Sequence, residues 1–126
     1  MPVFFAGDMG KAELWLLPHF DDPNQSWVVL RWVNFCAARL MPYNDEVRSR
    51  HPLHAQGLSA IRWAAVATGT EWLAEATSAV FVDDGPPLLH YVILLKENTV
   101  EVVASDIVVE RSEAPPAGGW MHKRVD

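Results

Sequence analysis

Two strand-like runs in the second half of the chain constrain the fold more than any other feature. Residues 88–97 (LLHYVILLKE) and 100–111 (VEVVASDIVVER) are rich in Val, Ile and Leu and flank the polar pair Asn98-Thr99. Branched and aromatic residues favour strands, and two such runs around a short polar connection predict an antiparallel hairpin. The first run is largely apolar on both of its alternating faces, so we expect it to be central in a sheet or covered on both sides.

A second hairpin is predicted nearer the N-terminus. The apolar residues 12–20 (AELWLLPHF) precede the polar residues 21–26 (DDPNQS), which have the composition of a turn, and the Val-, Trp- and Phe-rich segment 27–41 follows. Asp22-Pro23 also has the composition of a helix N-terminus, with proline at the first helical position. The content of β-branched and aromatic residues over 27–35 favours the strand interpretation.

One helix is predicted between the hairpins, over residues 70–80. Thr68-Gly69-Thr70-Glu71 has the Ser/Thr-x-x-Glu spacing of a capping box. In the segment that follows, apolar and polar residues occupy opposite faces, which is typical of an amphipathic helix of about three turns. The apolar face holds Trp72, Leu73, Ala76 and Val80. The breaker at 83–87 (DDGPP) follows this helix.

The segment 59–67 (SAIRWAAVA) is compatible with a strand or with a short helix. As a helix it would form a helix-turn-helix unit with the segment after Gly69, and the second helix would have to enter the major groove of DNA. The exposed face of that second helix carries Glu71 and Glu75 and no Lys or Arg, so DNA phosphate would repel it. We therefore reject the DNA-binding interpretation.

These elements predict an α+β fold. We expect a curved antiparallel sheet of about five strands, built from the two hairpins plus one more strand, with the amphipathic helix packed on one face. A barrel-like sheet is the more strongly curved variant. The chain length suits a single domain over residues 1–111, followed by a Pro/Gly-rich C-terminal arm over 112–126. The arm carries Trp120, and we expect self-association through this arm or through the sheet edges.

Composition limits the partners. Sixteen Asp and Glu against ten Lys and Arg give a net charge of −6, and the basic residues are scattered, so we expect no nucleic-acid binding. We find no basic-then-apolar leader and no apolar run near the ~18 residues of a membrane helix, so we expect no membrane association. Cys36 is the only cysteine, which excludes an internal disulfide and a Cys-rich zinc site and favours a cytoplasmic location.

The loop over residues 43–54 (YNDEVRSRHPLH) concentrates ionisable side chains in an otherwise apolar chain. Loops on a rigid scaffold are where binding and catalytic groups gather, so we place the candidate site here. The candidate binding residues are Tyr43, Asn44, Asp45, Glu46, Arg48, His51 and His54.

The two histidines of this loop are three residues apart, and imidazoles at that spacing can share a metal ion with a nearby carboxylate. Pro52 prevents the regular helix that gives such motifs their geometry, so we assign no metal, and the sequence identifies no particular cofactor. A carboxylate beside His51 would orient its ring for acid–base chemistry, although the same pairing occurs in structural networks. His90 is expected to be a hydrogen-bonded strand residue, and the metal hypothesis would gain weight if the sheet brought it beside this loop.

Known catalytic motifs are absent: we find no Gly-rich phosphate loop and no Gly-x-Ser-x-Gly element. The sequence therefore predicts a small soluble binding or interaction domain of unknown ligand and without catalysis. The alternative is an enzyme, or a small-ligand or metal-binding protein, in which the loop over 43–54 carries out acid–base or metal-assisted chemistry.

Overall fold

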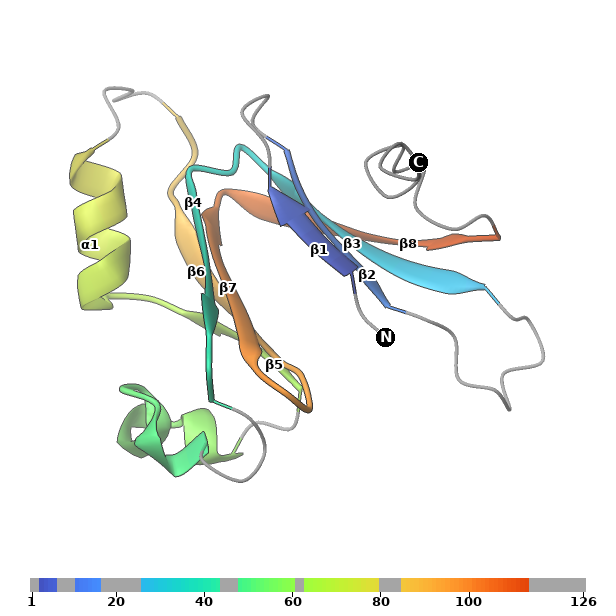
Figure 1. Ribbon diagram of the computed structural model, residues 1–126. Coiled ribbons are helices and arrows are strands. Elements are labelled where there is room, and N and C mark those ends of the chain that lie inside the picture. Colours follow the sequence, from blue (N-terminus) through green and yellow to red (C-terminus); the bar gives the residue numbers. More distant parts are fainter. Residues whose placement is uncertain are drawn as a thin grey trace, which may run out of the picture.

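The computed structural model describes residues 3–6, 11–16, 26–43, 48–60, 63–79 and 85–113. Over these ranges the chain forms two antiparallel sheets of four strands each and one α-helix (Figure 1). One sheet has the order β1-β2-β3-β8 and the other β4-β7-β6-β5. The strands are β1 (Val3–Ala6), β2 (Ala12–Leu16), β3 (Trp27–Val33), β4 (Ala37–Met41), β5 (Ala64–Ala67), β6 (Leu89–Leu94), β7 (Thr99–Ala104) and β8 (Asp106–Ser112).

The two sheets meet at a corner where two neighbouring strand pairs bend together. At this corner the chain passes from β3 to β4 and from β7 to β8 (Figure 1). Backbone hydrogen bonds between the two runs continue across the bend. Cys36 N–H donates to Val103 O at 2.9 Å, and Ser105 N–H donates to Val33 O at 2.9 Å. Asn34 makes the bend with a positive φ of 53°, and its Nδ2 donates to Ser105 Oγ at 3.0 Å.

This corner supports a first prediction. Asn34→Ala is expected to destabilise the fold by about 1 kcal/mol, because alanine lacks the polar side chain that lets asparagine tolerate positive φ and the side-chain hydrogen bond to Ser105 is lost. Asn34→Gly is the matched control, since glycine adopts positive φ freely and should lose less stability than alanine. Urea unfolding midpoints measure both. An alanine variant as stable as the wild type would contradict the strain argument.

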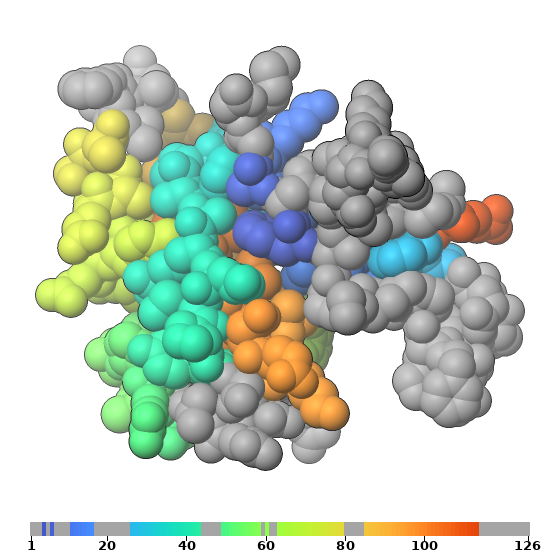
Figure 2. All heavy atoms as spheres, viewed as in Figure 1, coloured from blue at the N-terminus to red at the C-terminus, as the bar shows by residue number. Residues whose placement is uncertain are grey.

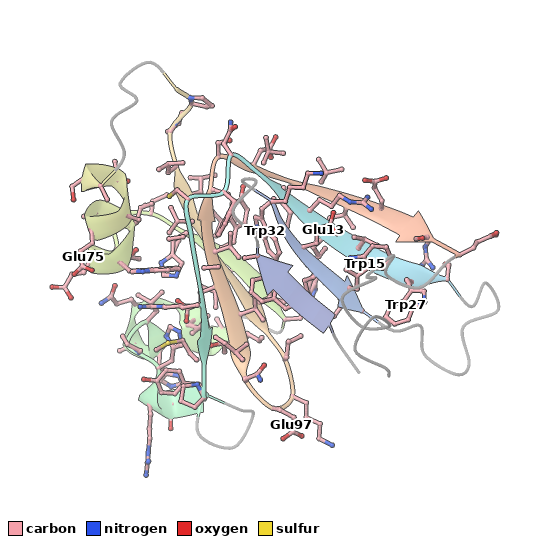
Figure 3. All side chains as sticks on the ribbon, turned by 45° about the horizontal axis from the view of Figure 1, so that its top comes forward. Glu13, Trp15, Trp27, Trp32, Glu75 and Glu97 are labelled. Atoms are coloured by element: carbon pink, nitrogen blue, oxygen red, sulfur yellow. The ribbon has the colours of Figure 1, made fainter. Side chains whose placement is uncertain are left out.

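The main core lies between the two sheets. Its buried side chains alternate along the strands with those of the opposite face, as a two-residue period requires. Trp32 lies between the sheets (Figure 3), with its ring 6.3 Å from that of Tyr91 in an edge-on arrangement. The buried members are Ala12, Leu14, Leu30, Trp32, Tyr91, Ile93, Val100, Val102 and Ala104.

The other face of the β4-β7-β6-β5 sheet is covered by helical segments. Helix α1 (Glu71–Ser78) and the 3-10 turns η1 (Arg48–Arg50), η2 (His54–Gln56) and η3 (Leu58–Ala60) lie on the side away from the first sheet (Figure 1). All of β7 and nearly all of β6 are therefore buried on both faces. This confirms the prediction that the run 88–97 contains a strand covered on both sides, although the strand spans only Leu89–Leu94.

The coarse fold class is confirmed, and its details need correction. Both predicted hairpins exist, as β2–β3 and β6–β7, although the first turn lies mainly within residues 17–25, outside the described residues. The expectation of about five strands in one sheet was wrong. The runs 27–41 and 100–111 each bend and divide between the two sheets, and β1 was not predicted. No closed barrel exists within the described ranges, because β1 and β5 do not pair.

The elements between the two hairpins have boundaries that differ from the predicted ones. The ambiguous segment 59–67 contains strand β5, preceded by η3. Helix α1 is capped by Thr70 rather than Thr68, because the chain turns at Gly69 with a φ of 70° before the helix begins. The predicted helix end at Val80 lies outside the described residues, as does most of the arm, including Trp120. No helix in the part of the chain described here is long and apolar enough to cross a membrane.

Candidate functional site

A carboxylate buried under the helical segments organises the candidate site. Glu101 lies in the middle of β7, and its side chain is 0% exposed. Val100 and Val102 point into the core between the sheets, so the strand period directs Glu101 to the opposite face, toward η1, η2 and α1. The strand register places Arg39 of β4 and Val92 of β6 on either side of it.

Three basic side chains from different elements converge on this carboxylate. His90 Nε2 of β6 lies 2.6 Å from Oε1, and Arg39 Nη2 donates to the same oxygen at 2.9 Å. His51 Nε2, from the loop between η1 and η2, lies 2.6 Å from Oε2. Both histidines are buried, and both oxygens of Glu101 have strong partners.

The hydrogen bonds indicate which ring nitrogen of each histidine donates to Glu101. Leu53 N–H donates to His51 Nδ1 at 3.0 Å, so Nδ1 is the acceptor and the proton of the neutral ring is on Nε2, which donates to Glu101. For His90, the Thr70 hydroxyl at 2.9 Å can donate to Nδ1 while Nε2–H donates to Glu101. This arrangement gives a partner to both nitrogens of each ring and to both oxygens of Glu101, and Arg39 balances the carboxylate charge.

The pKa of Glu101 reflects two opposing effects. Burial raises it, because a carboxylate loses its hydration when it leaves water. Hydrogen bonds from His90, His51 and Arg39, together with the Arg39 charge, lower the pKa by more than burial raises it, from 4.5 to about 2. Glu101 is therefore ionised at neutral pH, and its negative charge is fully paired inside the protein.

The network continues outward to helix α1. The Thr70 hydroxyl, bonded to His90, also accepts the N–H of Leu73 at 3.2 Å and so caps the helix. The Trp72 ring lies edge-on to His90, with ring centroids 4.9 Å apart. The guanidinium of Arg39 lies over the Trp72 ring, 4.2 Å from its centroid. These contacts hold the start of the helix on the buried carboxylate cluster.

Substitution of Thr70 tests this attachment. Thr70→Val is expected to lower the free energy of unfolding by about 1–2 kcal/mol, because it removes the helix cap and the hydrogen-bond partner of His90 while preserving side-chain volume. Thr70→Ser keeps the hydroxyl and should lie close to the wild type. Chemical denaturation of the three proteins measures the difference. A serine variant as unstable as the valine variant would show that the methyl packing, not the hydroxyl, matters.

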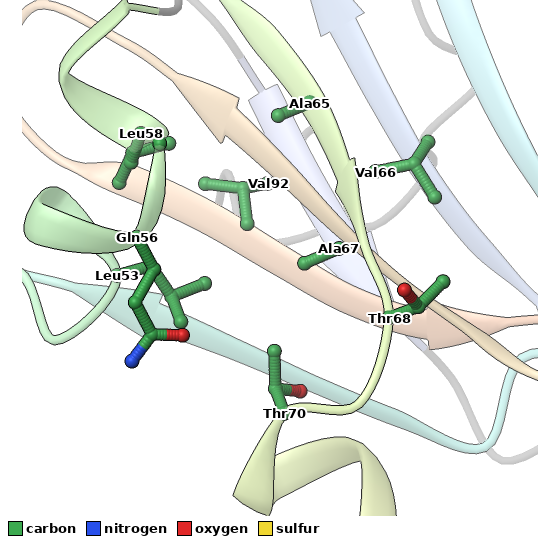
Figure 4. A pocket seen from close by; sticks show the side chains of 10 residues that line it. Leu53, Gln56, Leu58, Ala65, Val66, Ala67, Thr68, Thr70 and Val92 are labelled. Carbon is green, nitrogen blue, oxygen red and sulfur yellow. The ribbon is translucent and has the colours of Figure 1, made fainter.

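Two cavities adjoin this cluster on the face of the sheet where α1 lies beside β4 (Figure 2). Figure 4 shows the side chains that line one of them, the second described below. The first, here called the polar cleft, has a volume of about 310 Å³. It is lined by Arg39, Pro52, Leu53, Gln56, Gly69, Thr70, Glu71, Trp72, Glu75 and His90. The second, here called the apolar groove, has a volume of about 330 Å³ and is lined by Leu53, Gln56, Gly57, Leu58, Ala65, Val66, Ala67, Thr68, Thr70 and Val92. The two share Leu53, Gln56 and Thr70, so they are neighbours beneath α1 and η2.

The structure places the candidate residues of the 43–54 loop in different settings. His51 is part of the buried cluster, and the Tyr43 ring lies 5.0 Å from its ring. His54 begins η2, and its Nδ1 is buried without a hydrogen-bond partner among the described residues. Arg48 begins η1. Asn44, Asp45 and Glu46 lie outside the described residues.

Sequence reasoning missed the acid that holds His51. Glu101 lies fifty positions away in the chain, and Arg39, Thr70 and Trp72 were also not recognised as members of one cluster. One signal was present: Glu101 is the only charged residue within the apolar run VEVVA, and His90 lies in the strand expected to pair with it. A charged residue in a strand buried on both faces requires a partner.

The sheet brings His90 beside the 43–54 loop, the arrangement that was expected to give weight to the metal hypothesis. Among the described residues, however, no group of three or more His, Cys, Asp or Glu side chains is arranged to hold a metal ion. His51 and His90 both direct Nε2 at the carboxylate as hydrogen-bond donors, and a protonated nitrogen has no lone pair for a metal. The geometry supports a hydrogen-bonded cluster.

Comparisons of the chain with protein-family models, with curated proteins and with solved structures give no match. The geometry of the site is therefore the basis for inferring function.

Proposed function

We propose that this protein is a small non-catalytic binding domain whose ligand occupies the polar cleft and the apolar groove. The observation that supports this most is the saturation of the cluster beneath them. All four ring nitrogens of His51 and His90 are hydrogen bonded, and Arg39 is paired with Glu101. A general base must reach the substrate proton with a free nitrogen or oxygen, so this saturation favours binding over the enzymatic alternative.

The cavities have properties suited to a binding site. Each volume lies near the lower end of the roughly 300–1,000 Å³ typical of small-ligand pockets. The groove offers an apolar floor, while the cleft adds polar groups and the Trp72 ring, a combination that gives both affinity and orientation. The buried cluster holds three elements of the wall in place, so little ordering is needed when a ligand binds.

A fragment screen by protein NMR tests the proposal. We expect hits to shift the indole signal of Trp72 and the methyl signals of Leu58 and Val92. Ala65→Phe fills the groove and should weaken these hits at least tenfold. Ala74→Phe makes the same change on an exposed position of α1 and should leave binding unchanged. Hits that shift only other surfaces, or that bind Ala65→Phe equally well, would contradict the proposed site.

A further inference from the structure

A backbone N–H group donates to the ring of His51, and the direction of this hydrogen bond cannot be reversed. Leu53 N–H donates to His51 Nδ1 at 3.0 Å, while Nε2 of the same ring lies 2.6 Å from Glu101 Oε2. A backbone N–H is always a donor, so Nδ1 must keep its lone pair for this bond to exist. A protonated ring carries hydrogen on both nitrogens. Uptake of a proton by His51 therefore breaks the bond to Leu53.

His90 differs from His51, because the partner of its Nδ1 is a hydroxyl group. Thr70 Oγ1 lies 2.9 Å from His90 Nδ1, and a hydroxyl can donate or accept. When the His90 ring takes up a proton, the hydroxyl can rotate and accept from Nδ1–H. Its second lone pair still accepts the N–H of Leu73. Protonation of His90 therefore leaves the backbone in place, and protonation of His51 does not.

Leu53 connects the His51 bond to the walls of both cavities. Its carbonyl accepts the N–H of Gln56 at 3.0 Å and the N–H of Leu58 at 3.2 Å, so it holds η2 and the start of η3. The side chains of Leu53 and Gln56 line the polar cleft and the apolar groove, and Figure 4 shows both beside the groove. Displacement of Leu53 therefore changes the shape of both cavities.

Charged and titratable groups reach His51 from several of the described elements. Glu101 of β7 attracts a proton to the ring, whereas Arg39 of β4, paired with the same carboxylate, repels it. The Tyr43 ring lies 5.0 Å from the His51 ring. The other groups are His90 of β6, which shares Glu101, Arg50 and His54 on either side of His51 in the chain, and Glu71 and Glu75 of α1, which line the adjoining cleft. These groups influence the pH at which the proton binds, while the bond to Leu53 decides the structural effect of that proton.

We infer that His51 makes ligand binding dependent on pH: when its ring takes up a proton, Leu53 is released and the site loses affinity for its ligand. This inference rests on the proposed binding function and concerns the regulation of that site. Histidine is the side chain that ordinarily exchanges protons near neutral pH. Protonation of Glu101 is a separate event at lower pH, because hydrogen bonds and the Arg39 charge lower the pKa of Glu101 to about 2.

NMR of the ligand-free protein tests the release of Leu53. The Hε1–Cε1 signal of His51 and the backbone amide signal of Leu53 are followed from pH 8 to pH 5, the range in which histidine ordinarily titrates. We expect both signals to change with one midpoint, because one proton controls both. A His51 ring that takes up no proton down to pH 5, or a Leu53 amide that does not follow it, would show the inference to be wrong. This measurement needs no substitution.

Two variants assign the effect to His51. His51→Asn does not titrate, and its side-chain oxygen can accept the N–H two residues further on, as in an Asx turn. His54→Gln is the matched control, because it removes the neighbouring histidine of η2 and leaves the bond to Leu53. We expect the Leu53 amide signal to lose its pH dependence in the first variant and to keep it in the second. The reverse result would assign the effect to His54 and contradict the inference.

An uncharged probe tests the effect on binding. 2-Naphthylmethanol has no ionisable group in this range, so a change in its affinity comes from the protein. Its affinity, measured by the shift of the Trp72 indole signal, should fall about fivefold or more from pH 8 to pH 5, because one lost hydrogen bond changes an equilibrium by about that factor. His54→Gln should keep this dependence and His51→Asn should remove it. Equal affinity of the wild type at both pH values would overturn the inference.

The two measurements separate this inference from the proposed function. If the probe binds equally at both pH values and Leu53 does not follow His51, the inference is wrong and the proposed binding function stands. If Leu53 follows His51 but neither the probe nor any fragment binds the cavities, the proposed function is wrong, and the regulation of binding fails with it.

Discussion

Glu101→Ala is expected to destabilise the protein by about 3–5 kcal/mol, a large part of the roughly 5–15 kcal/mol that a domain of this kind possesses. The substitution removes the acceptor for His51, His90 and Arg39 together. Two buried Nε2–H donors then have no partner, and an unsatisfied buried donor costs the full desolvation penalty. The same change leaves a cavity in a strand that is packed on both faces.

The matched control is Glu97→Ala, which removes a carboxylate from the exposed turn between β6 and β7 (Figure 3). Exposed substitutions away from packed features change stability by about 0.5 kcal/mol or less, so this variant should resemble the wild type. Equilibrium unfolding in urea, followed by tryptophan fluorescence, measures both variants. A Glu101→Ala protein within 1 kcal/mol of the wild type would mean that the buried cluster contributes little to the fold.

The free energy of unfolding of the wild-type protein is expected to fall by about 3 kcal/mol in acid because of Glu101 alone. The pKa of Glu101 is lowered from 4.5 to about 2 in the folded state, because its hydrogen bonds and the Arg39 charge outweigh burial. Above pH 4.5 the carboxylate is ionised in both states, so its contribution is complete. Between pH 4.5 and 2 only the unfolded state binds the proton, and the contribution is lost as pH falls.

Urea unfolding at intervals from pH 7 to pH 2 measures this dependence. The Glu101→Gln variant isolates it, because other carboxylates titrate in both proteins and cancel in the difference. We expect the stability gap between wild type and variant to be constant above pH 5 and to shrink toward pH 2. A gap that does not change with pH in that range would contradict the lowered pKa of Glu101.

The same cluster has a consequence for the binding surface. It links β4, β6 and β7, the loop before η2 and the cap of α1 through a single carboxylate. A variant that breaks the hydrogen bonds of Glu101 should therefore weaken binding in the groove, because it disturbs the elements that form the walls of the groove. Glu101 itself does not line the cavity. This differs from Ala65→Phe, which should block binding while the melting temperature stays close to that of the wild type.

Local sequence patterns determined the elements that need no distant partner. The two hairpins follow from β-rich runs around short polar connections, and helix α1 follows from a threonine cap before an amphipathic segment. Even here one detail was wrong, because the capping-box spacing pointed to Thr68, whereas the chain turns at Gly69 and Thr70 caps the helix. The acidic balance and the single cysteine are likewise properties of the sequence alone.

The tertiary structure decided which distant residues meet. Nothing local to residues 27–41 or 100–111 shows that both runs bend together and pass between sheets, because that bend exists only when the two strands are paired. His51 was recognised from its neighbours in the loop, yet its acid is Glu101, brought to it by the pairing of β4, β7 and β6. Periodicity along a chain records which face of a strand is buried, whereas the partner buried against that face depends on register and packing across the whole fold.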